Sequence, residues 1–380
     1  MKYCLITHSL ACGGAERCVA ALANHWAAAG HEVVVVTQAP RTLDFYALHP
    51  GVGRVALALD RPSTGAWQAV AHNLARVRAL RQVLRQERPD VAVGVMTASN
   101  CLLALARSLG GGTYLAVGSE EYPPYMRPLG QPWETLRRLL YPRLDAVVSH
   151  AAPSAQWLQR HAGVRCAPVL PNPIPWPLPR QAPLLATAPA FPEQKTLLAV
   201  GRLAPEKGFG RLLRAFAGLA PRHPQWRLVI LGEGPGRAGL EAQRQALALQ
   251  DRVFLPGLAG NVGDWYTAAD LFALTSHHEG FGNALAEALM HGLPAVSVDC
   301  EAGPREILRH GVDGLLVPQD EPTALASALD RMMADEALRS ACARRAVEAR
   351  ERFAPAQVAA RWDALFDDLR QARPVRAGVS

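Results

Sequence analysis

The chain alternates between short apolar segments and longer amphipathic ones, and the alternation begins in its first half. The apolar runs are YCLITHSL (3–10), HEVVVVTQ (31–38), PDVAVGVMT (89–97), TYLAVGSEE (113–121) and LDAVVSH (144–150). Helical patterns stand between several of them, at 13–30, 66–88 and 100–110. Near-continuous apolar strands that alternate with helices predict a parallel sheet covered by helices on both faces.

Prolines interrupt this rhythm at 169–194, and a second series follows. Its predicted strands are 195–203, 226–234, 251–258, 271–276, 294–300 and 313–318. Its predicted helices are 208–224, 236–250, 283–291, 321–334, 335–350 and 355–372. We therefore predict an α/β protein with a domain at 1–170, a semi-rigid proline-rich linker at 171–194 and a second domain at 195–354. The C-terminal helix within 355–380 is expected to pack back toward the first domain.

The composition agrees with two globular domains. The chain has 380 residues, which is too long for one ordinary core. No run of about 18 apolar residues is present, and the first residues lack the long apolar stretch of a signal peptide. The seven cysteines are scattered without a C-x-x-C pair, which favours reduced thiols over a disulfide framework or a zinc site. These observations predict a cytoplasmic protein.

The positive charge is concentrated in the first domain. Residues 1–170 hold 17 Lys and Arg against 10 Asp and Glu, whereas residues 171–380 hold 23 of each. Many of the arginines lie in the helical patterns 76–90 and 133–143. A solvated helix face explains this pattern, and so does a surface for anionic lipid headgroups or a diphosphate-bearing acceptor. Nucleic acid is not expected, because the basic residues do not form a recognisable reading module.

Two carboxylates, Glu279 and Glu287, flank the start of the predicted helix 283–291. Asn283 is a good N-cap residue, and Gly282 before it lets the backbone turn. A helix N-terminus with flanking glycines suits a phosphate. The alternative is that Glu279 caps the helix and Glu287 faces water.

Three other turns that follow strands carry glycine or charge. Gly13 and Gly14 follow the first strand. Arg202 and Lys207 follow the strand that ends at Val200, where two cations suit a diphosphate, although they also fit a surface pair. The third turn, LGEGPGR (231–237), contains Gly232 and Glu233. It is not a dinucleotide fingerprint, because Arg237 replaces the third glycine.

Taken together, these segments resemble the family-4 retaining glycosyltransferases of the GT-B fold. The resemblance covers nearly the whole chain and is carried by GGAER (13–17), LPNPI (170–174), VGRLAPEKGFGRLLRAFA (200–217), LVILGEGP (228–235), LPG (255–257), EGFGNALAEAL (279–289) and DCEAGPREILRHGVDGLLVP (299–318). It implies two doubly wound Rossmann-like domains that face each other across a cleft, the first binding the acceptor and the second the nucleotide-sugar. The branch that it most resembles adds hexoses or N-acetylhexosamines to polyprenyl-diphosphate-linked or lipopolysaccharide acceptors.

The resemblance also implies roles for matching residues. Glu279 would contact hydroxyls of the donor sugar, and Glu287 the ribose hydroxyls. Arg202 and Lys207 would neutralise the leaving diphosphate, and no metal or other cofactor is expected. The backbone N–H groups of three further residues would hold the sugar or the distal phosphate: Phe281, Gly282 and Asn283. Gly13 and Gly14 would let the first turn approach the diphosphate and acceptor, while Gly232 and Glu233 would belong to the donor site.

One loop departs from the family pattern. The closest branch often shows Ser-Glu-Arg-Asn, but this chain has Ser119-Glu120-Glu121-Tyr122. Glu120 is therefore a candidate for the acceptor pocket, and Glu121 stands where an arginine is expected. His8 and His150 are further candidates, although a lone histidine near a strand end is more often structural.

The resulting functional prediction is a retaining transferase, with UDP favoured as the donor nucleotide. Its acceptor would be a glycan, expected to be lipid-linked, in cell-envelope polysaccharide biosynthesis, and the protein could bind peripherally to the inner face of the membrane. The alternatives are a GT-B epimerase that acts on the sugar nucleotide itself, a non-catalytic relative that only binds it, and a Rossmann oxidoreductase. The incomplete fingerprint at Arg237 counts against the oxidoreductase.

Overall fold

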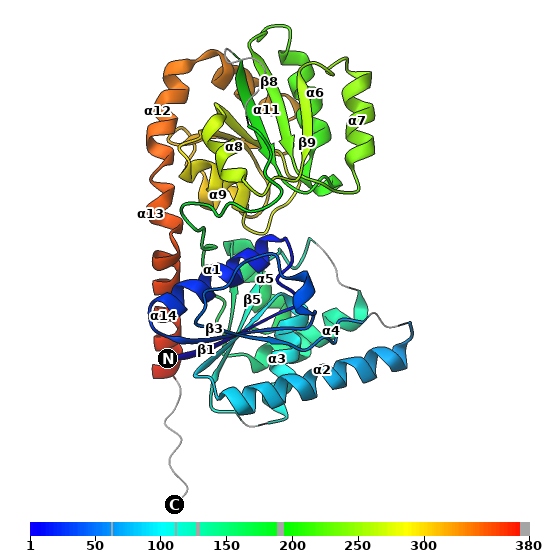
Figure 1. The fold of residues 1–380 in the computed structure, drawn as a ribbon, viewed down its shortest axis with the longest axis vertical. Helices are drawn as coiled ribbons and strands as arrows, with labels where there is room; N and C mark the ends of the chain where they lie inside the picture. The colour runs from blue at the N-terminus through cyan, green and yellow to red at the C-terminus, as the bar shows by residue number, and fades with distance from the viewer. Residues whose placement is uncertain (62–63, 111, 127–129, 188–193, 373–380) are drawn as a thin grey trace, which may run out of the picture. The chain divides into compact units, whose positions relative to one another are not determined.

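The computed structural model describes residues 1–380 except 62–63, 111, 127–129, 188–193 and 373–380. The chain forms two compact units, one made of Met1–Pro173 with Pro355–Ser380 and the other of Ile174–Ala354. Each unit contains one six-stranded sheet in which every pairing is parallel. The prediction of two doubly wound α/β sheets is therefore confirmed (Figure 1).

The first unit has the strand order β3-β2-β1-β4-β5-β6. Its strands are β1 (Lys2–Thr7), β2 (Glu32–Thr37), β3 (Val52–Ala56), β4 (Val91–Val95), β5 (Leu115–Glu120) and β6 (Ala146–Ser149). Its helices are α1 (Gly14–Ala28), α2 (Ala66–Glu87), α3 (Thr97–Ser108), α4 (Gln131–Leu140), α5 (Ala152–Ala162) and α14 (Pro355–Gln371), with short 3₁₀ turns η1 (Arg41–Leu43) and η2 (Tyr141–Arg143).

The two faces of this sheet bury alternate residues of each strand, as the period of a strand requires. Tyr3 and Leu5 of β1 belong to a core that includes buried residues of α1 and α14. Cys4 and Ile6 belong to a core that includes buried residues of α2, α3 and α5. Both faces are therefore covered by helices, which explains why the strand sequences are almost wholly apolar.

The C-terminal helix α14 completes the first of these two cores. Its buried residues repeat at helical spacing: Val358, Ala359, Trp362, Leu365 and Phe366. The Phe366 ring lies 5.9 Å from the Tyr3 ring and 6.2 Å from the Trp26 ring, measured between centroids. The hydroxyl of Tyr3 also donates a 2.9 Å hydrogen bond to Asp363. The last helix is thus a structural part of the first unit.

The second unit repeats the topology of the first, with the strand order β12-β11-β10-β7-β8-β9. Its strands are β7 (Lys195–Val200), β8 (Trp226–Leu231), β9 (Val253–Gly257), β10 (Leu271–Leu274), β11 (Ala295–Asp299) and β12 (Gly314–Pro318). Its helices are α6 (Phe209–Leu219), α7 (Arg237–Ala246), α8 (Val262–Ala268), α9 (Asn283–Met290), α10 (Pro304–Ile307), α11 (Pro322–Ala334), α12 (Glu336–Ala346) and α13 (Ala349–Phe353), with a 3₁₀ turn η3 (Pro205–Lys207).

In both units the strand order reverses next to the first strand, between β1 and β4 and between β7 and β10. Connections on the two sides of such a point leave toward opposite faces of the sheet. Ligands of doubly wound sheets bind at such a point, outside the carboxyl ends of the two central strands.

From Ile174 onward, the described part of the segment expected to be a linker is attached to the second unit. Ile174 and Leu178 are buried in the core that contains α9. The N–H of Ile174 donates to Phe353, and the N–H of Gln181 donates to Gly260, at 2.9 and 3.1 Å. Prolines prevent regular structure here, but they do not prevent packing, so this part of 171–194 is not a free connector. Residues 188–193 lie outside the described residues.

The edge strand β3 was missed by the reading of the sequence. It is five residues long, contains Gly53 and Arg54, and has only one fully buried residue, Val52. The Arg54 guanidinium makes two hydrogen bonds with the Asp44 carboxylate, at 2.9 and 2.8 Å. A short edge strand with a charged residue does not show the apolar run that identified the other strands.

None of the described helices combines the length and the apolar character needed to cross a bilayer.

Replacing Phe366 by alanine should destabilise the first unit by about 3–5 kcal/mol, because it leaves a cavity against Tyr3 and Trp26. Hydrogen exchange followed by mass spectrometry should show faster exchange in β1 and α1, with β7 and β8 unchanged. Arg361→Ala, at an exposed position of the same helix, is the control and should change neither. Unchanged exchange in Phe366→Ala would contradict the assignment of α14 to the first unit.

Candidate functional site

The carboxyl edge of the second sheet brings together residues that are far apart in the sequence. The loop after β7 carries Arg202 and Lys207, and the loop after β10 carries Glu279 and Gly282. Because β7 and β10 are neighbours at the point where the strand order reverses, the two loops leave from adjacent strand ends. This edge is where a doubly wound sheet binds its ligand.

Hydrogen bonds join the two loops directly. The hydroxyl of Thr275 donates to the carbonyl of Lys207 at 3.1 Å, and the N–H of His277 donates to the carbonyl of Glu206 at 2.8 Å. Arg211, in the first turn of α6, donates to the carbonyls of Thr275 and Ser276 at 2.7 and 2.6 Å. The positions of Lys207 and Glu279 are therefore fixed relative to each other by the backbone that carries them.

Glycine at position 208 permits this close approach. Gly208 has a φ of +64°, and a Cβ there would lie 2.0 Å from the carbonyl oxygen of Thr275. A side chain at this position would push the two loops apart. Glycine at this position therefore allows the loops after β7 and β10 to be in direct contact.

Lys207 and Glu279 form an ion pair at the centre of this arrangement. The Lys207 ammonium lies 2.6 Å from Oε1 of Glu279, and the Ser276 hydroxyl donates to the same oxygen at 2.5 Å. The Glu279 side chain is 9% exposed and that of Lys207 is 24% exposed. A carboxylate this buried requires its partners, because a buried charge left alone costs several kcal/mol. Lys207 has three N–H groups, and only one is needed for Glu279.

A glycine turn leads from Glu279 into α9. Gly282 has a φ of +105° and is the residue that caps the helix, so the expectation that Asn283 is the N-cap is wrong. Asn283 is instead the first helical residue, since left-handed backbone at the cap favours glycine over asparagine. The Phe281 ring is buried and packs edge-to-face on Phe353, at 5.5 Å between centroids. This anchors the turn and leaves its backbone at the sheet edge.

The loop after β11 closes on the same turn. Gly303 has a φ of +98°, and a Cβ there would lie 2.2 Å from the carbonyl oxygen of Phe281. Loops from three adjacent strands, β7, β10 and β11, thus converge at the N-terminus of α9. The positive end of the helix dipole there attracts anions.

The loop after β8 supports the loop after β7. A Cβ on Gly232 would lie 1.9 Å from the carbonyl oxygen of Gly201, and the N–H of Leu203 donates to the carbonyl of Glu233 at 2.9 Å. The Glu233 side chain forms two hydrogen bonds with Arg237, at 2.6 and 2.9 Å. Bonding to Arg237 lowers the pKa of Glu233. Arg237 therefore fixes the loop after β8 by bonding to Glu233. This role explains why an arginine stands at the position where a dinucleotide fingerprint has its third glycine.

Arg202 and Glu287 lie in different surroundings. The Arg202 side chain is 63% exposed and pairs with Glu206 at 2.6 Å. The Glu287 carboxylate is buried and accepts a 3.0 Å hydrogen bond from the hydroxyl of Tyr266 in α8. The roles expected for these two residues, on the diphosphate and on the ribose, stay predictions.

The predicted residues of the first unit lie at the carboxyl edge of its own sheet. Gly13 is the capping residue of α1 and Gly14 is its first residue, and the Tyr46 hydroxyl donates to the carbonyl of Gly13 at 3.0 Å. Glu16, in the first turn of α1, has its pKa raised by burial. His8 is exposed just after β1. The role expected for Gly13 and Gly14 also stays a prediction.

Glu120, the last residue of β5, is enclosed by side chains of the helical face that contains α3 and α4. It accepts hydrogen bonds from the hydroxyl of Thr97 at 2.8 and 3.0 Å and from that of Tyr141, and the Arg137 guanidinium lies 3.8 Å away. Burial raises the pKa of Glu120, and Arg137 opposes that shift. Glu120 is therefore part of a buried network, and its expected role toward an acceptor stays a prediction.

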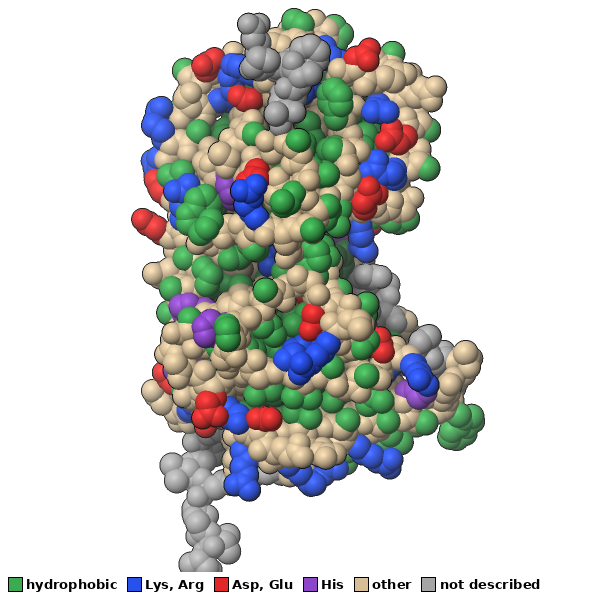
Figure 2. Space-filling view, viewed as in Figure 1, with side chains coloured by type: hydrophobic (Ala, Val, Ile, Leu, Met, Phe, Trp, Pro, Cys, Tyr) green, Lys and Arg blue, Asp and Glu red, His purple; other side chains and the backbone are tan. Residues whose placement is uncertain are grey.

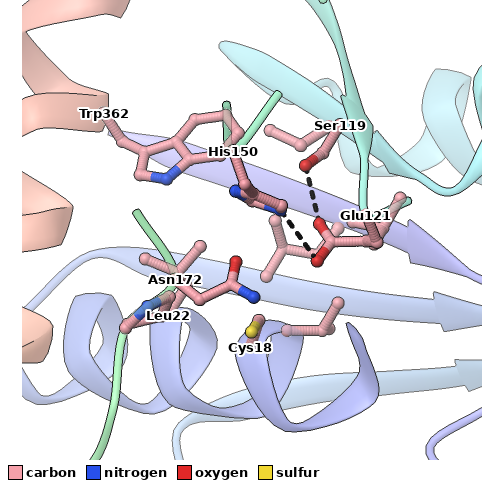
Figure 3. A pocket seen from close by; sticks show the side chains of 12 residues that line it. Cys18, Leu22, Ser119, Glu121, His150, Asn172 and Trp362 are labelled. Carbon is pink, nitrogen blue, oxygen red and sulfur yellow. Dashed lines mark hydrogen bonds and ion pairs between the residues drawn. The ribbon is translucent and has the colours of Figure 1, made fainter. Parts of the chain in front are cut away.

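The next residue, Glu121, lines a cavity on the other face of the sheet. The cavity has a volume of about 20 Å³, which is room for about one water molecule. Its polar lining consists of Ser119, Glu121, His150 and Asn172, and Trp362 of α14 lies at its side (Figure 3). The Ser119 hydroxyl donates to Glu121 at 2.7 Å, and Nε2 of His150 lies 3.0 Å from the same carboxylate.

His150 fits this cavity as an imidazolium. Its Nδ1 lies 2.8 Å from the carbonyl oxygen of Leu170, so both ring nitrogens face acceptors, which favours the doubly protonated ring. Burial alone would lower the pKa of His150, but the Glu121 carboxylate outweighs it and the pKa is raised. Burial likewise opposes ionisation of Glu121, but His150 holds the pKa of Glu121 below its usual value.

Several of these residues were missed by the reading of the sequence. Ser276 and Tyr266 carry no motif that marks them as partners of the two predicted carboxylates, and nothing marks Arg211 as a donor to the loop after β10. Glu121 and His150 were considered separately, but 29 positions separate them and nothing local indicates that they pair. Among the described residues, no group of three or more His, Cys, Asp or Glu side chains is placed to hold a metal ion.

Comparison with known proteins adds two family matches. Residues 186–349 match the family described as glycosyl transferases group 1, and residues 12–175 match glycosyltransferase family 4. The match to residues 12–175 begins after β1 and the match to residues 186–349 includes β7 to β12, and together they cover most of the chain.

Three similar proteins illustrate the range of relatives. An exopolysaccharide phosphotransferase of Streptomyces coelicolor is 34% identical over 80% of this chain, although the chain spans only 31% of its length. A transferase of Campylobacter jejuni, named for adding an α-1,4-N-acetyl-D-galactosamine to an undecaprenol-diphosphate-linked glycan, is 27% identical over 98% of this chain and 100% of its own. The solved structure of Anabaena HepE with UDP and glucose has a TM-score of 0.78, 21% identity and coverage of 97% of this chain and 100% of its own.

Stability should depend on pH through His150 and Glu121. A histidine whose pKa is raised by folding stabilises the folded state below its unfolded pKa of 6.5, and this effect is lost as the pH rises through the raised value. A carboxylate whose pKa is lowered stabilises above its unfolded pKa of 4.5, and this effect is lost as the pH falls through the lowered value. The ion pair should therefore contribute most to the free energy of unfolding between pH 4.5 and pH 6.5.

Urea unfolding at a series of pH values measures this dependence. His150→Asn should remove the part of the stability loss that the wild type shows as the pH rises above 6.5. His161→Asn, at an exposed histidine, is the control and should keep the wild-type profile. A His150→Asn profile that matches the wild type would show that the pair is not ionised in the folded protein.

Proposed function

Because the chain belongs to the family-4 glycosyltransferases of the GT-B fold, we propose that it moves a hexose or N-acetylhexosamine from a nucleotide-diphospho-sugar to a glycan acceptor. UDP is the favoured donor nucleotide, and the acceptor is lipid-linked. The anomeric configuration is retained. The observation that carries this proposal is the Lys207–Glu279 pair beside the N-terminus of α9, at the reversal of the second sheet.

The names of the relatives support the choice of substrates. The Campylobacter jejuni transferase, which this chain matches over its full length, is named for an undecaprenol-diphosphate acceptor. HepE, whose fold is similar, was solved with UDP and glucose. A lipid-linked acceptor would place the protein at the inner face of the membrane as a peripheral enzyme.

The site suits the departure of a nucleoside diphosphate. Cleavage of the bond between the sugar and the phosphate leaves the negative charge on the diphosphate. The Lys207 ammonium has N–H groups beyond the one that Glu279 uses, and the exposed Arg202 guanidinium can exchange Glu206 for a phosphate. The N-terminus of α9 adds a positive dipole end. Such preorganised groups stabilise charge as it develops, so no metal is needed.

The two carboxylates, Glu279 and Glu287, then bind different parts of the donor. Glu279, fixed by Lys207 and Ser276, accepts hydrogen bonds from hydroxyls of the donor sugar. Glu287, fixed by Tyr266, accepts from the ribose hydroxyls. The backbone N–H groups of Phe281, Gly282 and Asn283 hold the sugar or the distal phosphate. The proton of the attacking acceptor hydroxyl passes to the departing phosphate oxygen, so no side chain acts as a base.

Two other functions are compatible with the same donor site. An epimerase would change the sugar nucleotide without an acceptor, and a non-catalytic relative would bind it without turnover. Analysis of the products with and without a lipid-linked acceptor separates all three. Transfer that requires the acceptor supports the proposal, whereas an altered sugar nucleotide without acceptor supports the epimerase.

Lys207→Met should lower kcat for transfer by about 10²–10³, because it removes a positive charge that stabilises the leaving group. The donor for this assay is the sugar nucleotide that raises the melting temperature most among UDP-, GDP- and ADP-sugars, since a ligand that binds only the folded state stabilises it. The control Arg214→Met changes an exposed cation on the outer side of α6. Wild-type turnover in Lys207→Met would refute the role of the pair.

Chelation should leave the rate unchanged, because Lys207, Arg202 and the start of α9 supply the positive charge. The measurement compares the initial rate of transfer before and after dialysis against EDTA, with and without added Mg²⁺ or Mn²⁺. A loss of activity that either metal restores would show that a cation shares the diphosphate with these groups.

A further inference from the structure

Residues 174–187, which we call the connecting segment, follow the first unit in the chain and pack on the second unit. They form neither helix nor strand, so their backbone groups need partners outside regular structure. The segment is attached in two places, at the loop between β9 and α8 and at the end of α9. Both attachments lead to Glu287, the carboxylate that the proposed function assigns to the ribose.

The first attachment is a set of hydrogen bonds with the loop before α8. The N–H of Gln181 donates to the carbonyl of Gly260 at 3.1 Å, and the N–H of Gly260 donates to the carbonyl of Pro183 at 2.6 Å. The buried side-chain amide of Asn261 accepts from the N–H of Leu185 and donates to its carbonyl, both at 2.9 Å. The residue just before α8 is therefore fixed by the connecting segment.

Glycine at position 260 is required for this contact. A Cβ there would lie 1.9 Å from the carbonyl oxygen of Gln181, so any side chain would push the connecting segment away from the loop. By contrast, a Cβ on Gly239 of α7 would meet nothing within 4 Å.

The second attachment is a series of aromatic rings. The Trp176 ring lies 4.6 Å from the His291 ring, which in turn lies 5.3 Å from the Tyr266 ring, measured between centroids. The Arg350 guanidinium lies 4.0 Å from the centroid of the Trp176 ring. Nδ1 of His291 donates to the backbone carbonyl of Glu287 at 2.8 Å. Figure 2, which has the view of Figure 1, shows hydrophobic, basic and histidine side chains next to one another where α9 lies.

The imidazole of His291 suits this place as a neutral ring. Burial lowers the pKa of His291, so at neutral pH the ring packs between its aromatic neighbours without a charge that would have to be desolvated. Trp176 thus contacts Tyr266 through His291.

The two attachments meet at Tyr266. Helix α8 begins directly after Asn261, so the place of Tyr266 follows from where the connecting segment holds the start of the helix. Tyr266 and Glu287 are both buried, and the hydroxyl donates to the carboxylate at 3.0 Å. A hydrogen bond to a carboxylate is strong, so the position of this hydroxyl helps to set that of the Glu287 carboxylate.

We propose that the connecting segment positions Glu287 for the donor nucleotide, with Trp176 and the backbone on either side of Ala182 holding the helix that carries Tyr266. This inference rests on the proposed function, because it takes Glu287 as the group that binds the ribose. Trp176 is a positioning residue and is not among the groups that stabilise the leaving diphosphate. Loosening the segment should therefore weaken donor binding and leave the rate at saturating donor unchanged.

Calorimetric titration with UDP, GDP and ADP measures the effect on binding, and the nucleotide that binds the wild type most tightly is then used for the variants. Trp176→Ala should raise its Kd about three- to tenfold, because it removes the ring contact with His291. Trp176→Phe keeps a ring and should restore most of the affinity. Leu184→Ala is the control, because its side chain is 61% exposed in the same segment, and it should bind as the wild type does.

A matched pair of glycine variants tests the backbone contact. Gly260→Ala should raise the Kd about tenfold, because its Cβ meets the carbonyl of Gln181. Gly239→Ala adds the same methyl group where there is space and should leave the Kd unchanged. In transfer assays, the donor KM of Trp176→Ala and Gly260→Ala should rise with the Kd, while kcat stays within about twofold of the wild type.

Hydrogen exchange without any ligand tests the structural step. In Trp176→Ala and Gly260→Ala, exchange should be faster in α8 and α9 and unchanged in α6 and α11. Wild-type nucleotide affinity in both variants overturns the proposal. So does faster exchange throughout the second unit, because the segment would then only stabilise the fold. A wild type that binds none of the three nucleotides refutes the proposed function instead, and exchange in α8 and α9 still decides whether the segment holds Tyr266.

Discussion

The ion pair between Lys207 and Glu279 is the interaction on which the site of the second unit depends. Its two residues lie 72 positions apart and meet because β7 and β10 are neighbours at the reversal of the strand order. The Glu279 carboxylate is buried, so its charge requires a partner there. The hydrogen bonds of Arg211 and Thr275, and the missing side chain at Gly208, hold the two loops in this register. The topology of the sheet thus determines the chemistry at its edge.

Much of this arrangement could be predicted from the sequence because the signals were local. Strands buried on both faces are continuous apolar runs, and the helices between them carry a period that can be read residue by residue. The helix predicted at 355–372 was found in this way. Gly282 and Gly303 are also local signals, because left-handed backbone favours glycine. The sequence even placed Lys207 and Glu279 at strand ends, from which their proximity follows once the order of the strands is known.

What could not be predicted depends on contacts between distant segments. The choice of Gly282 over Asn283 as the cap depends on how the turn meets the loop that contains Gly303. Arg237 breaks a known fingerprint, and its reason is a pairing with Glu233. The strand β3 lacks an apolar run because it lies at the edge of the sheet. In each case the residue type is known from the sequence, but the neighbouring segment that explains it is not.

The adjacent acids Glu120 and Glu121 show how far surroundings outweigh residue type. Side chains alternate across a strand, so Glu120 faces α3 and α4 while Glu121 faces the side of α1 and α14. Burial raises the pKa of Glu120, whereas His150 lowers that of Glu121. Glu121, which stands where the family resemblance leads one to expect an arginine, therefore affects only one face of the sheet. That face includes Asn172, where the chain is about to leave the first unit, and Trp362, where it has returned. His150 bonds to Leu170 and Glu121 to Asn172, so the charge pair ties the body of the unit to the segment that leaves it, which an arginine facing His150 could not do because two cations repel.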